Sequence, residues 1–495
     1  MKLPLSRSAA ALAATTALAF AGTLTAVDAN AAPGGKPPSA KACATRPNDI
    51  SDRLTQCVTL AGVREHQKAL QQIADANGGT RASGSPGYDA SADYVQAKLE
   101  AAGWTVSTQE FPYHRFRVLS PSVLEQVTPG PTGPLPHTIM TYSRSGDVTA
   151  AVTAPSGDFR GCTAADWAGF PAGNIAIVSR GTPPGAPTCT FGIKVLNAQA
   201  AGASGVVLYN NVAGDLAGTL GAGFVGTIPA VGITQSLGQT LLTTPDLVLR
   251  LKTDTISTLT TTTNVIAEKP GLRDDNVVMA GAHLDSVEAG PGINDNGSGS
   301  GALLEVAEQL AKVTPRNTLR FAWWGGEEGN LIGSTAYVNS LDFEEQLDIA
   351  LYLNFDMIGS PNYVFFVYDG DDSDATGAGP GPFGSAQIED LFEGYYAARG
   401  LPSKGTDFSG RSDYGPFIAV GIPSGGLFTG AEGVKTAQEA ATWGGTAGIA
   451  YDPCYHQACD TYANNSDTAL DVNSDAMAHA IITYATSTAD VNGLP

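Results

Sequence analysis

The chain has 495 residues, a length that favours two folded units over a single domain. Hydrophobic residues make up 43% and charged residues only 15%, with 59 glycines and 30 prolines, which is typical of a loop-rich globular protein and excludes a coiled coil or a disordered chain. The formal net charge of −21 argues against nucleic acid as a partner and against docking on an anionic membrane.

The first 31 residues have the pattern of a signal peptide. Lys2 and Arg7 precede an apolar run over 9–21 that is too short to span a bilayer, and an A-x-A cleavage site follows at 29–31. The later sequence has no stretch of the ~20 apolar residues that a membrane helix needs. We therefore expect a secreted, extracellular protein.

Export makes the six cysteines candidates for disulfide bonds. Their spacing favours three local bridges over a cysteine-zinc site, because the sequence contains no C-x-x-C. The expected bridges are Cys43–Cys57, Cys162–Cys189 and Cys454–Cys459.

Residues 32–45 are rich in Pro, Gly and Ala and are expected to form a linker or a pro-segment. Apolar residues at three- and four-residue spacing over 63–76 and 88–102 then predict two helices, with Gly103 ending the second. A short strand is expected over 104–111.

From about 119 to 258 the chain becomes rich in Pro, Gly and Thr and predicts short strands around one helix at 194–203. Apolar runs at 264–271, 275–285, 318–325 and 349–359 then predict strands, with a helical pattern such as 301–313 between them. Strands that alternate with helices indicate an α/β fold with a mixed, mostly parallel central sheet and helices on both faces. A β-rich insert interrupts it.

The sequence has only six histidines, so each can be considered by itself. His283 ends an apolar strand before a glycine-rich loop, at the strand end where open α/β sheets place their ligands. Asp285 projects to the same side and is expected to orient the imidazole. Four others have contexts typical of surface or hydrogen-bonded structural histidines, namely His66, His114, His137 and His479.

Acidic residues follow the next two predicted strands. Glu327 and Glu328 come directly after one strand, and Asp356 closes the other. Two adjacent carboxylates directly after a buried strand are electrostatically unfavourable unless a positive charge lies nearby. Asp295 lies in the glycine-rich loop that follows His283, and His456 lies inside the loop that Cys454–Cys459 would close.

Two imidazoles and three carboxylates suit zinc better than magnesium or calcium, which prefer oxygen ligands alone. Five ligands exceed what one open catalytic zinc needs, so we expect a pair of zinc ions that share a bridging carboxylate. The ligands would be His283, Asp295, Glu328, Asp356 and His456. Glu327 then has no required ligand role and lies where a general base would act.

The segments GAHLDSV, GINDNGSGS, LRFAWWGGEE, YLNFDMIG, GRSDYGPF and CYHQACD resemble, in order and spacing, the secreted bacterial di-zinc leucine aminopeptidases (aminopeptidase Y-like). The resemblance runs from about 63 to 482, apart from the insert. IAIVSRG, CTFGIKVLNAQAAGASGVVLYNN and IPAVGIT look like a protease-associated domain, and this insert is expected to shape access to the cleft rather than to recruit substrate.

The resemblance implies that Asp295 bridges the two ions and that the Asp295–Asn296 peptide bond is cis. It also implies that Tyr455 donates its phenol to the oxyanion and that Arg411 orients the substrate backbone. The pocket for the first side chain would be lined by Met357, Gly410 and Phe428. A family calcium site would use Asp471 and Asp475, although its N-terminal acidic partner is missing, because Asp49–Ile50 lies some eight residues too early.

The domains expected on this basis are a signal peptide (1–31), a linker or pro-segment (32–45), a catalytic domain in two parts (46–118 and 259–487), a protease-associated insert (119–258) and a tail (488–495).

We expect a monomeric enzyme that removes a large apolar residue (Leu, Phe or Met) from peptide N-termini, by attack of a zinc-bridging water with Glu327 as the general base. The rivals are another hydrolase on the same fold, such as a carboxypeptidase, dipeptidase or amidohydrolase, and a receptor-like protein that binds without chemistry. A calcium-stabilised adhesion module would not explain the two imidazoles.

Overall fold

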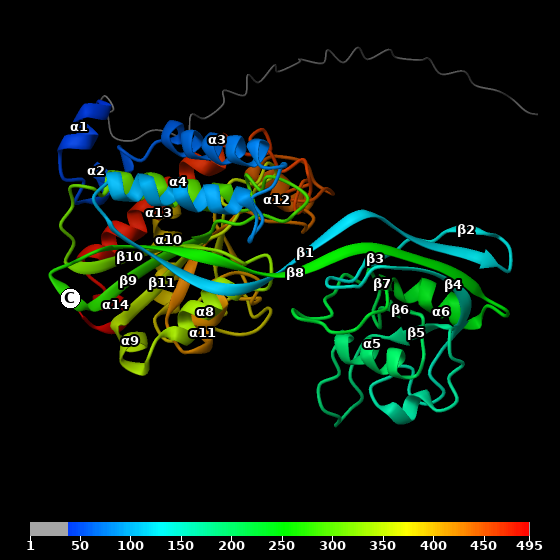
Figure 1. Cartoon of the computed structure of the whole chain (residues 1–495). Helices are drawn as coiled ribbons and strands as arrows, with labels where there is room; N and C mark the ends of the chain where they lie inside the picture. Colours follow the sequence, from blue (N-terminus) through cyan, green and yellow to red (C-terminus); the bar gives the residue numbers. More distant parts are fainter. Residues whose placement is uncertain (1–37, 495) are drawn as a thin grey trace, which may run out of the picture.

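The computed structural model describes residues 38–494. The predicted signal peptide (1–31) and the first part of the predicted linker (32–37) lie outside the described residues. Figure 1 shows a larger α/β unit and a smaller unit beside it, which are connected by the long strands β1 (Thr105–Thr128) and β8 (Val248–Lys269). Within residues 38–494, no helix combines the length and the apolar character needed to cross a bilayer.

The larger unit is built on a mixed, mostly parallel sheet. Its strands besides β1 and β8 are β9 (Arg273–His283), β10 (Asn317–Trp324), β11 (Ile349–Phe355), β12 (Phe366–Tyr368), β13 (Lys404–Thr406) and β14 (Ser424–Phe428). Their order is β13-β12-β14-β11-β9-β10-β8. The central strands β10, β9, β11 and β14 are parallel to one another, so their carboxyl ends meet at one edge.

Helices cover both faces of this sheet, as predicted. One face packs against α3 (Leu60–Ala76), α4 (Pro86–Ala101), α7 (Gly297–Gln309), α10 (Ser385–Ala398) and α13 (Asp467–Thr486), and the other against α8 (Ile332–Ser340) and α11 (Tyr414–Ala419). Side chains alternate along each strand. In β10, Phe321 and Trp323 join the first core, whereas Ala322 and Trp324 join the second.

The smaller unit has cores of its own. Its strands are β2 (Gly133–Pro134), β3 (Thr138–Ile139), β4 (Gly146–Thr153), β5 (Ile175–Ser179), β6 (Gly205–Tyr209) and β7 (Ala230–Ile233), and its helices are α5 (Phe191–Ala200), α6 (Gln235–Thr243) and a 3₁₀ turn (Ala164–Trp167). The parallel strands β5, β6 and β7 are almost fully buried, which explains their continuous apolar sequences.

β1 and β8 form an antiparallel ribbon from the pair Thr105/Glu268 to the pair Thr128/Val248. One end of β8 pairs with β10 and the other with β4, so the ribbon belongs to both units. The predictions of a short strand at 104–111 and a separate strand at 264–271 were therefore wrong in length. Each strand is lengthened by its hydrogen bonds to the other strand. A local sequence pattern cannot predict this length, because the partner strand is more than 100 residues away in the sequence.

The described parts of the predicted linker (38–45) and of the predicted tail (488–494) each contain a short helix. Ser39 caps a short helix, α1 (Ala40–Thr45), inside the predicted linker, and the Cys43–Cys57 bridge ties it to the chain beyond α2 (Ser51–Thr55). The predicted tail contains α14 (Ala489–Asn492), whose Val491 is buried. The other two expected disulfides, Cys162–Cys189 and Cys454–Cys459, are also present. Two further helices are α9 (Phe343–Asp348) and α12 (Ala437–Trp443).

Candidate metal centre and adjoining cavity

Three neighbouring strands deliver polar side chains to the same edge of the sheet. His283 is the last residue of β9, Glu327 and Glu328 follow β10 after two glycines, and Asp356 follows β11 directly. His283 is 1% exposed and Asp356 is 9% exposed. The order of these parallel strands thus brings together residues that are far apart in the sequence.

Asp295 reaches the same place from the loop between β9 and α7. The Asp460 carboxylate accepts hydrogen bonds from the backbone N–H groups of Asn294 (2.8 Å) and Asp295 (2.9 Å), which fixes this loop. The next side chain, Asn296, caps α7 by accepting from the Gly299 N–H. The Asp295–Asn296 peptide bond is cis, as the resemblance implied.

His456 lies in the small loop closed by Cys454–Cys459, with a left-handed backbone (φ 57°). Asp460 follows this loop immediately and is the residue that holds the Asp295 backbone. The disulfide loop and the Asp295 loop are therefore fastened to each other.

The donors form two groups that share Asp295. Asp295 Oδ1 lies 3.2 Å from His283 Nε2, and Asp295 Oδ2 lies 3.3 Å from His456 Nε2. On the first side, Asp356 Oδ1 is also 3.2 Å from His283 Nε2, and Glu327 Oε2 is 3.9 Å away. On the second side, Glu328 Oε2 is 3.0 Å from His456 Nε2.

Neighbouring groups hold these donors in place. Ser412 Oγ donates to Asp356 Oδ2 at 2.6 Å and accepts from Asn354 Nδ2 at 2.8 Å. Asp285 differs in detail from the prediction, because the acceptor closest to His283 Nδ1 is the Asp285 backbone carbonyl at 3.0 Å, with its carboxylate at 3.6 Å. The Asp285 carboxylate instead accepts from the Glu327 N–H at 3.2 Å.

The pKa values follow from burial and from these close contacts. Burial raises the pKa of Glu328 to about 7, and the negative charge of Asp295 adds to the shift. Burial also raises the pKa of Glu327, against the opposing effect of His283. For His456, burial works in the opposite direction, but the Glu328 charge and the contacts with Asp295 raise its pKa to about 11.

The donor set fits divalent cations. Glu327, Glu328, Asp295 and Asp356 crowd together at a buried edge where the cationic partners are the two imidazoles, and carboxylates so close are unfavourable without more positive charge. Glu328 Oε1 is buried and has no hydrogen-bond partner among the described residues. Mixed nitrogen and oxygen donors favour zinc over calcium or magnesium.

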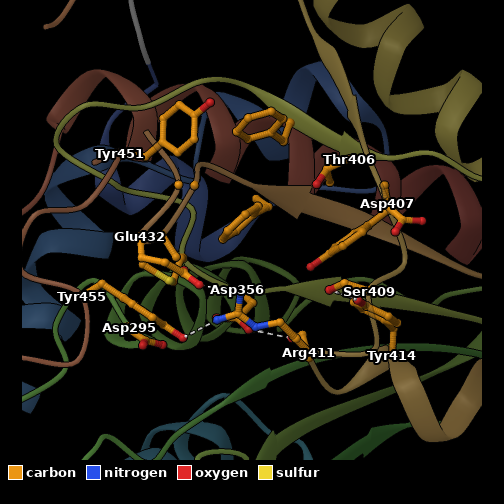
Figure 2. A pocket seen from close by; sticks show the side chains of 18 of the residues that line it. Asp295, Asp356, Thr406, Asp407, Ser409, Arg411, Tyr414, Glu432, Tyr451 and Tyr455 are labelled. Carbon is orange, nitrogen blue, oxygen red and sulfur yellow. Dashed lines mark hydrogen bonds and ion pairs between the residues drawn. The ribbon is translucent and has the colours of Figure 1, made fainter. Parts of the chain in front are cut away.

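An open cavity of about 350 Å³ adjoins the donor cluster. Figure 2 shows Asp295, Asp356, Arg411 and Tyr455 on the same side of this cavity, with Thr406 and Asp407 away from them. Arg411 donates to the Tyr455 hydroxyl (3.2 Å) and to Glu432 Oε1 (2.7 Å). Tyr455 also stacks on the His456 ring, with centroids 3.8 Å apart.

Two of the three predicted pocket residues line the cavity, namely Met357 and Phe428. Gly410 does not, because its N–H donates to the Tyr414 hydroxyl (2.9 Å) in a left-handed turn (φ 76°) that presents its neighbours Ser409 and Arg411 instead.

Several residues at the site and its cavity were not predicted from the sequence, namely Phe366, Tyr368, Ser412, Glu432 and Tyr451. Ser412 could have been predicted from the sequence, because it lies within the motif GRSDYGPF. The aromatic residues lie outside the quoted motifs, and only the folded chain brings them together.

Asp471 and Asp475, the candidate calcium ligands, lie one turn apart on α13. Burial raises the pKa of Asp475 to about 8, with a further contribution from Asp471. Asp49, which resembles the N-terminal partner of the family calcium site, forms an ion pair with Arg53 at 2.8 Å.

An α/β sheet with imidazoles and carboxylates gathered at its carboxyl edge, beside an open cavity, is the arrangement of a metal-dependent enzyme. Comparison with known proteins agrees: residues 264–481 match peptidase family M28, and residues 146–241 match the PA domain.

Among curated proteins, an aminopeptidase of Pseudomonas aeruginosa is 48% identical over 86% of this chain and 81% of its own length. Leucine aminopeptidase 2 of Trichophyton rubrum is 41% identical over 89% of this chain and 87% of its own. Among solved structures, an aminopeptidase from Aneurinibacillus sp. strain AM-1 is 28% identical, with a TM-score of 0.68 over 87% of this chain and 95% of that one. The chain belongs to peptidase family M28 and is an aminopeptidase that carries an inserted PA domain.

Proposed function

We propose that this aminopeptidase is a secreted two-zinc enzyme that removes a large apolar residue from the N-terminus of peptides. The observation that carries the proposal of two ions is the position of Asp295, whose two carboxylate oxygens face two different histidines. His283 and Asp356 would hold one ion, Glu328 and His456 the other, and Asp295 would bridge them. When bound, two such ions activate a water molecule and polarise the scissile carbonyl.

The chain's own side chains then handle the proton and the substrate. The Glu327 carboxylate lies in one group with the side chains of His283 and Asp356. It takes the proton from the attacking water and then delivers it to the leaving amine. The Tyr455 hydroxyl donates to the oxyanion, and the guanidinium of Arg411, which already contacts this hydroxyl, orients the substrate backbone. Glu327 and Asp356 are also placed to bind the free α-amino group of the substrate.

The cavity favours a large apolar first side chain. Its walls carry Met357, Phe366, Phe428 and Tyr451, and the rings of Phe366 and Phe428 stack with centroids 5.9 Å apart. Such walls suit Leu, Phe or Met through burial of apolar surface, at ~0.8 kcal/mol per CH₂ group. Because the residues that line the cavity all lie between 295 and 456, we propose that the PA insert shapes access from outside it.

The remaining proposals concern the whole chain. Export is supported by the signal-peptide pattern of residues 1–31 and by the three disulfides. We propose catalytic segments at 46–118 and 259–487 around the insert (119–258), and a monomer. A calcium ion held by Asp471 and Asp475 stays a prediction.

Glu327→Gln tests the assignment of the general base. We expect the variant to bind zinc as the wild type does and to lose nearly all turnover of unblocked aminoacyl amides, because an amide cannot accept the proton. Zinc quantification and turnover are measured on the same samples. Turnover above a few per cent of the wild type would show that another group is the base.

The same assay on a panel of substrates tests the specificity. Leu, Phe and Met amides are expected to be cleaved fastest, and acetylation of the substrate's amine is expected to abolish cleavage. Cleavage of acetylated peptides would instead favour a carboxypeptidase or an endopeptidase.

A further inference from the structure

A second group of metal-ligating side chains lies between α3 and α7, away from the cavity. His66 of α3 points its Nε2 toward Glu305 Oε2 (3.6 Å) and Glu308 Oε2 (3.8 Å), both on α7. Glu305 and Glu308 are three residues apart and therefore lie on the same face of the helix. The sequence had marked His66 as an ordinary structural histidine.

Each of the three side chains uses one of its two polar atoms to contact a neighbour outside the cluster. Its other polar atom faces the other two members. His66 Nδ1 pairs with the Tyr94 hydroxyl at 2.8 Å. Glu305 Oε1 accepts from Gln309 Nε2 at 3.1 Å. Glu308 Oε1 pairs with the Lys98 ammonium at 3.2 Å. The atoms left over are one imidazole nitrogen and two carboxylate oxygens, and these three atoms all lie within 4.8 Å of one another.

Burial makes this arrangement unfavourable as it stands. His66 is 1% exposed and its Nε2 has no hydrogen-bond partner among residues 38–494. The Glu305 side chain is 6% exposed, and its nearest cationic candidate is the imidazole at 3.6 Å. A buried carboxylate needs stronger compensation than one neutral amide donor and a distant imidazole.

The backbone around the cluster is shaped to hold the Glu305 carboxylate. A Cβ at position 62, one turn before His66, would collide with the carboxylate of Glu305. Gly62 therefore leaves room for this charged group inside the helix contact. The Glu305 carboxylate thus lies inside the contact between the two helices, beside the unpartnered His66 Nε2.

We propose that His66, Glu305 and Glu308 form a third binding site, for a structural divalent cation of the zinc class. The imidazole favours zinc over calcium and magnesium. With the proton on Nδ1, His66 would donate a hydrogen bond to the Tyr94 hydroxyl at 2.8 Å and leave the Nε2 lone pair for the metal. Glu308 is the most exposed of the three ligands, with a side chain 28% exposed, so water can complete the coordination on its side.

The bound ion would connect α3 to α7. α7 begins at Gly297, two residues after Asp295, and the Asp295 loop itself is held by the Asp460 carboxylate. This third site rests on residues separate from that centre, and it stands or falls independently of the two-zinc proposal.

Anomalous diffraction from crystals of the mature chain grown with zinc tests the site directly, because it reports positions. With data collected on both sides of the zinc edge, we expect a peak about 2.0–2.1 Å from His66 Nε2, in addition to density near His283 and His456. The absence of a peak at His66 would overturn the third site, whatever appears near Asp295.

Zinc content in solution gives a second readout. His66→Gln and Glu308→Gln should each bind one zinc ion fewer than the wild type and keep turnover, since neither residue lies at the cavity. The matched control is Glu65→Gln, an exposed acid on α3 whose carboxylate approaches Lys98 (3.9 Å) and lies outside the cluster. Equal zinc content in all four proteins would overturn the proposal, because it would mean that His66 only packs beside the two acids and is not a ligand.

Discussion

Glu327 and Glu328 are neighbours in sequence and yet face different partners. Glu328 Oε2 approaches His456, whereas Glu327 Oε2 approaches His283 from the other side of Asp295. The two residues lie where the chain bends and turns after Gly325 and Gly326, with the Glu327 carbonyl accepting from the Asn330 N–H at 2.8 Å, so their side chains leave the backbone in different directions. One pair of adjacent acids can therefore divide its work, with Glu328 as the proposed ligand and Glu327 as the proposed base.

The Ser412 hydroxyl is a positioning group for Asp356. Because it donates to the carboxylate oxygen that faces away from His283, Ser412→Ala should leave Asp356 free to rotate. We expect zinc affinity to fall about 10–100-fold, as is typical when a group that supports a metal ligand is lost. The measurement is a zinc titration of the metal-free enzyme against a chelator of known affinity.

Ser409→Ala serves as the control for this variant. Ser409 lines the same cavity and its hydroxyl contacts the Tyr414 hydroxyl at 3.4 Å, rather than a proposed ligand. Its zinc affinity should equal that of the wild type. If Ser412→Ala also bound zinc normally, Asp356 would be held by other contacts.

At the scale of elements, the sequence predicted the strand ends well and the cavity poorly. His283, Glu328 and Asp356 could be placed together because parallel strands end at one edge of a sheet, and a short apolar run shows where each strand stops. The cavity walls come from β12, β14, the segment 406–414 and the loop before α13. No local sequence pattern indicates that Phe366 and Tyr451 meet. The β1–β8 ribbon was missed for the same reason, since its length depends on a distant partner.

α12 shows how one carboxylate can anchor a short helix beside the cavity. Glu439 accepts from Lys404 Nζ (2.7 Å), from the Tyr451 hydroxyl (2.8 Å) and from the Thr436 N–H (2.8 Å). Burial alone would raise the pKa of Glu439, but these bonds lower it to about 2. Because this value lies below the ordinary ~4.3, charged Glu439 stabilises the fold above that pH, and the stabilisation is lost as the pH falls toward 2.

We therefore expect Glu439→Gln to lower the free energy of unfolding by about 2 kcal/mol at pH 6, the typical value of hydrogen bonds to a charged group. The difference from the wild type should shrink steadily between about pH 4.3 and pH 2. Urea unfolding at a series of pH values measures it, with the exposed Glu344→Gln on α9 as the control. A difference that stayed constant with pH would exclude the charge as its source.

At the scale of the whole molecule, the ribbon also touches the loop that carries Asp295. Arg115 of β1 makes a two-pronged ion pair with Glu288, which lies between His283 and Asp295; the Nη2–Oε2 distance is 2.9 Å. Both side chains are partly buried, at 19% and 29% exposed. The arm that leads to the PA insert is thus joined to the metal-binding edge.

A double-mutant cycle measures how strongly this contact acts. Arg115→Gln and Glu288→Gln should each lower the free energy of unfolding by about 1 kcal/mol, and the double variant should lose less than their sum, because paired planar groups gain from shared geometry. The cycle is read from urea unfolding at low and high salt. Strict additivity would show that the contact contributes nothing to stability.

The place where the chain leaves the larger unit has a consequence for how such enzymes gain and lose modules. Val118 and Thr255 are paired across the ribbon, and the register shifts just beyond them. Paired Cα atoms on antiparallel strands lie about 5 Å apart, so a tight turn could join the two positions without moving either strand. The segment between these two positions, which contains the PA insert, could therefore be removed without changing the order of the strands in the larger unit. Joining the chain directly from Val118 to Thr255 would delete the PA insert, and another domain could be inserted at the same place. The sheet edge that carries His283, Asp295 and His456 would keep its structure.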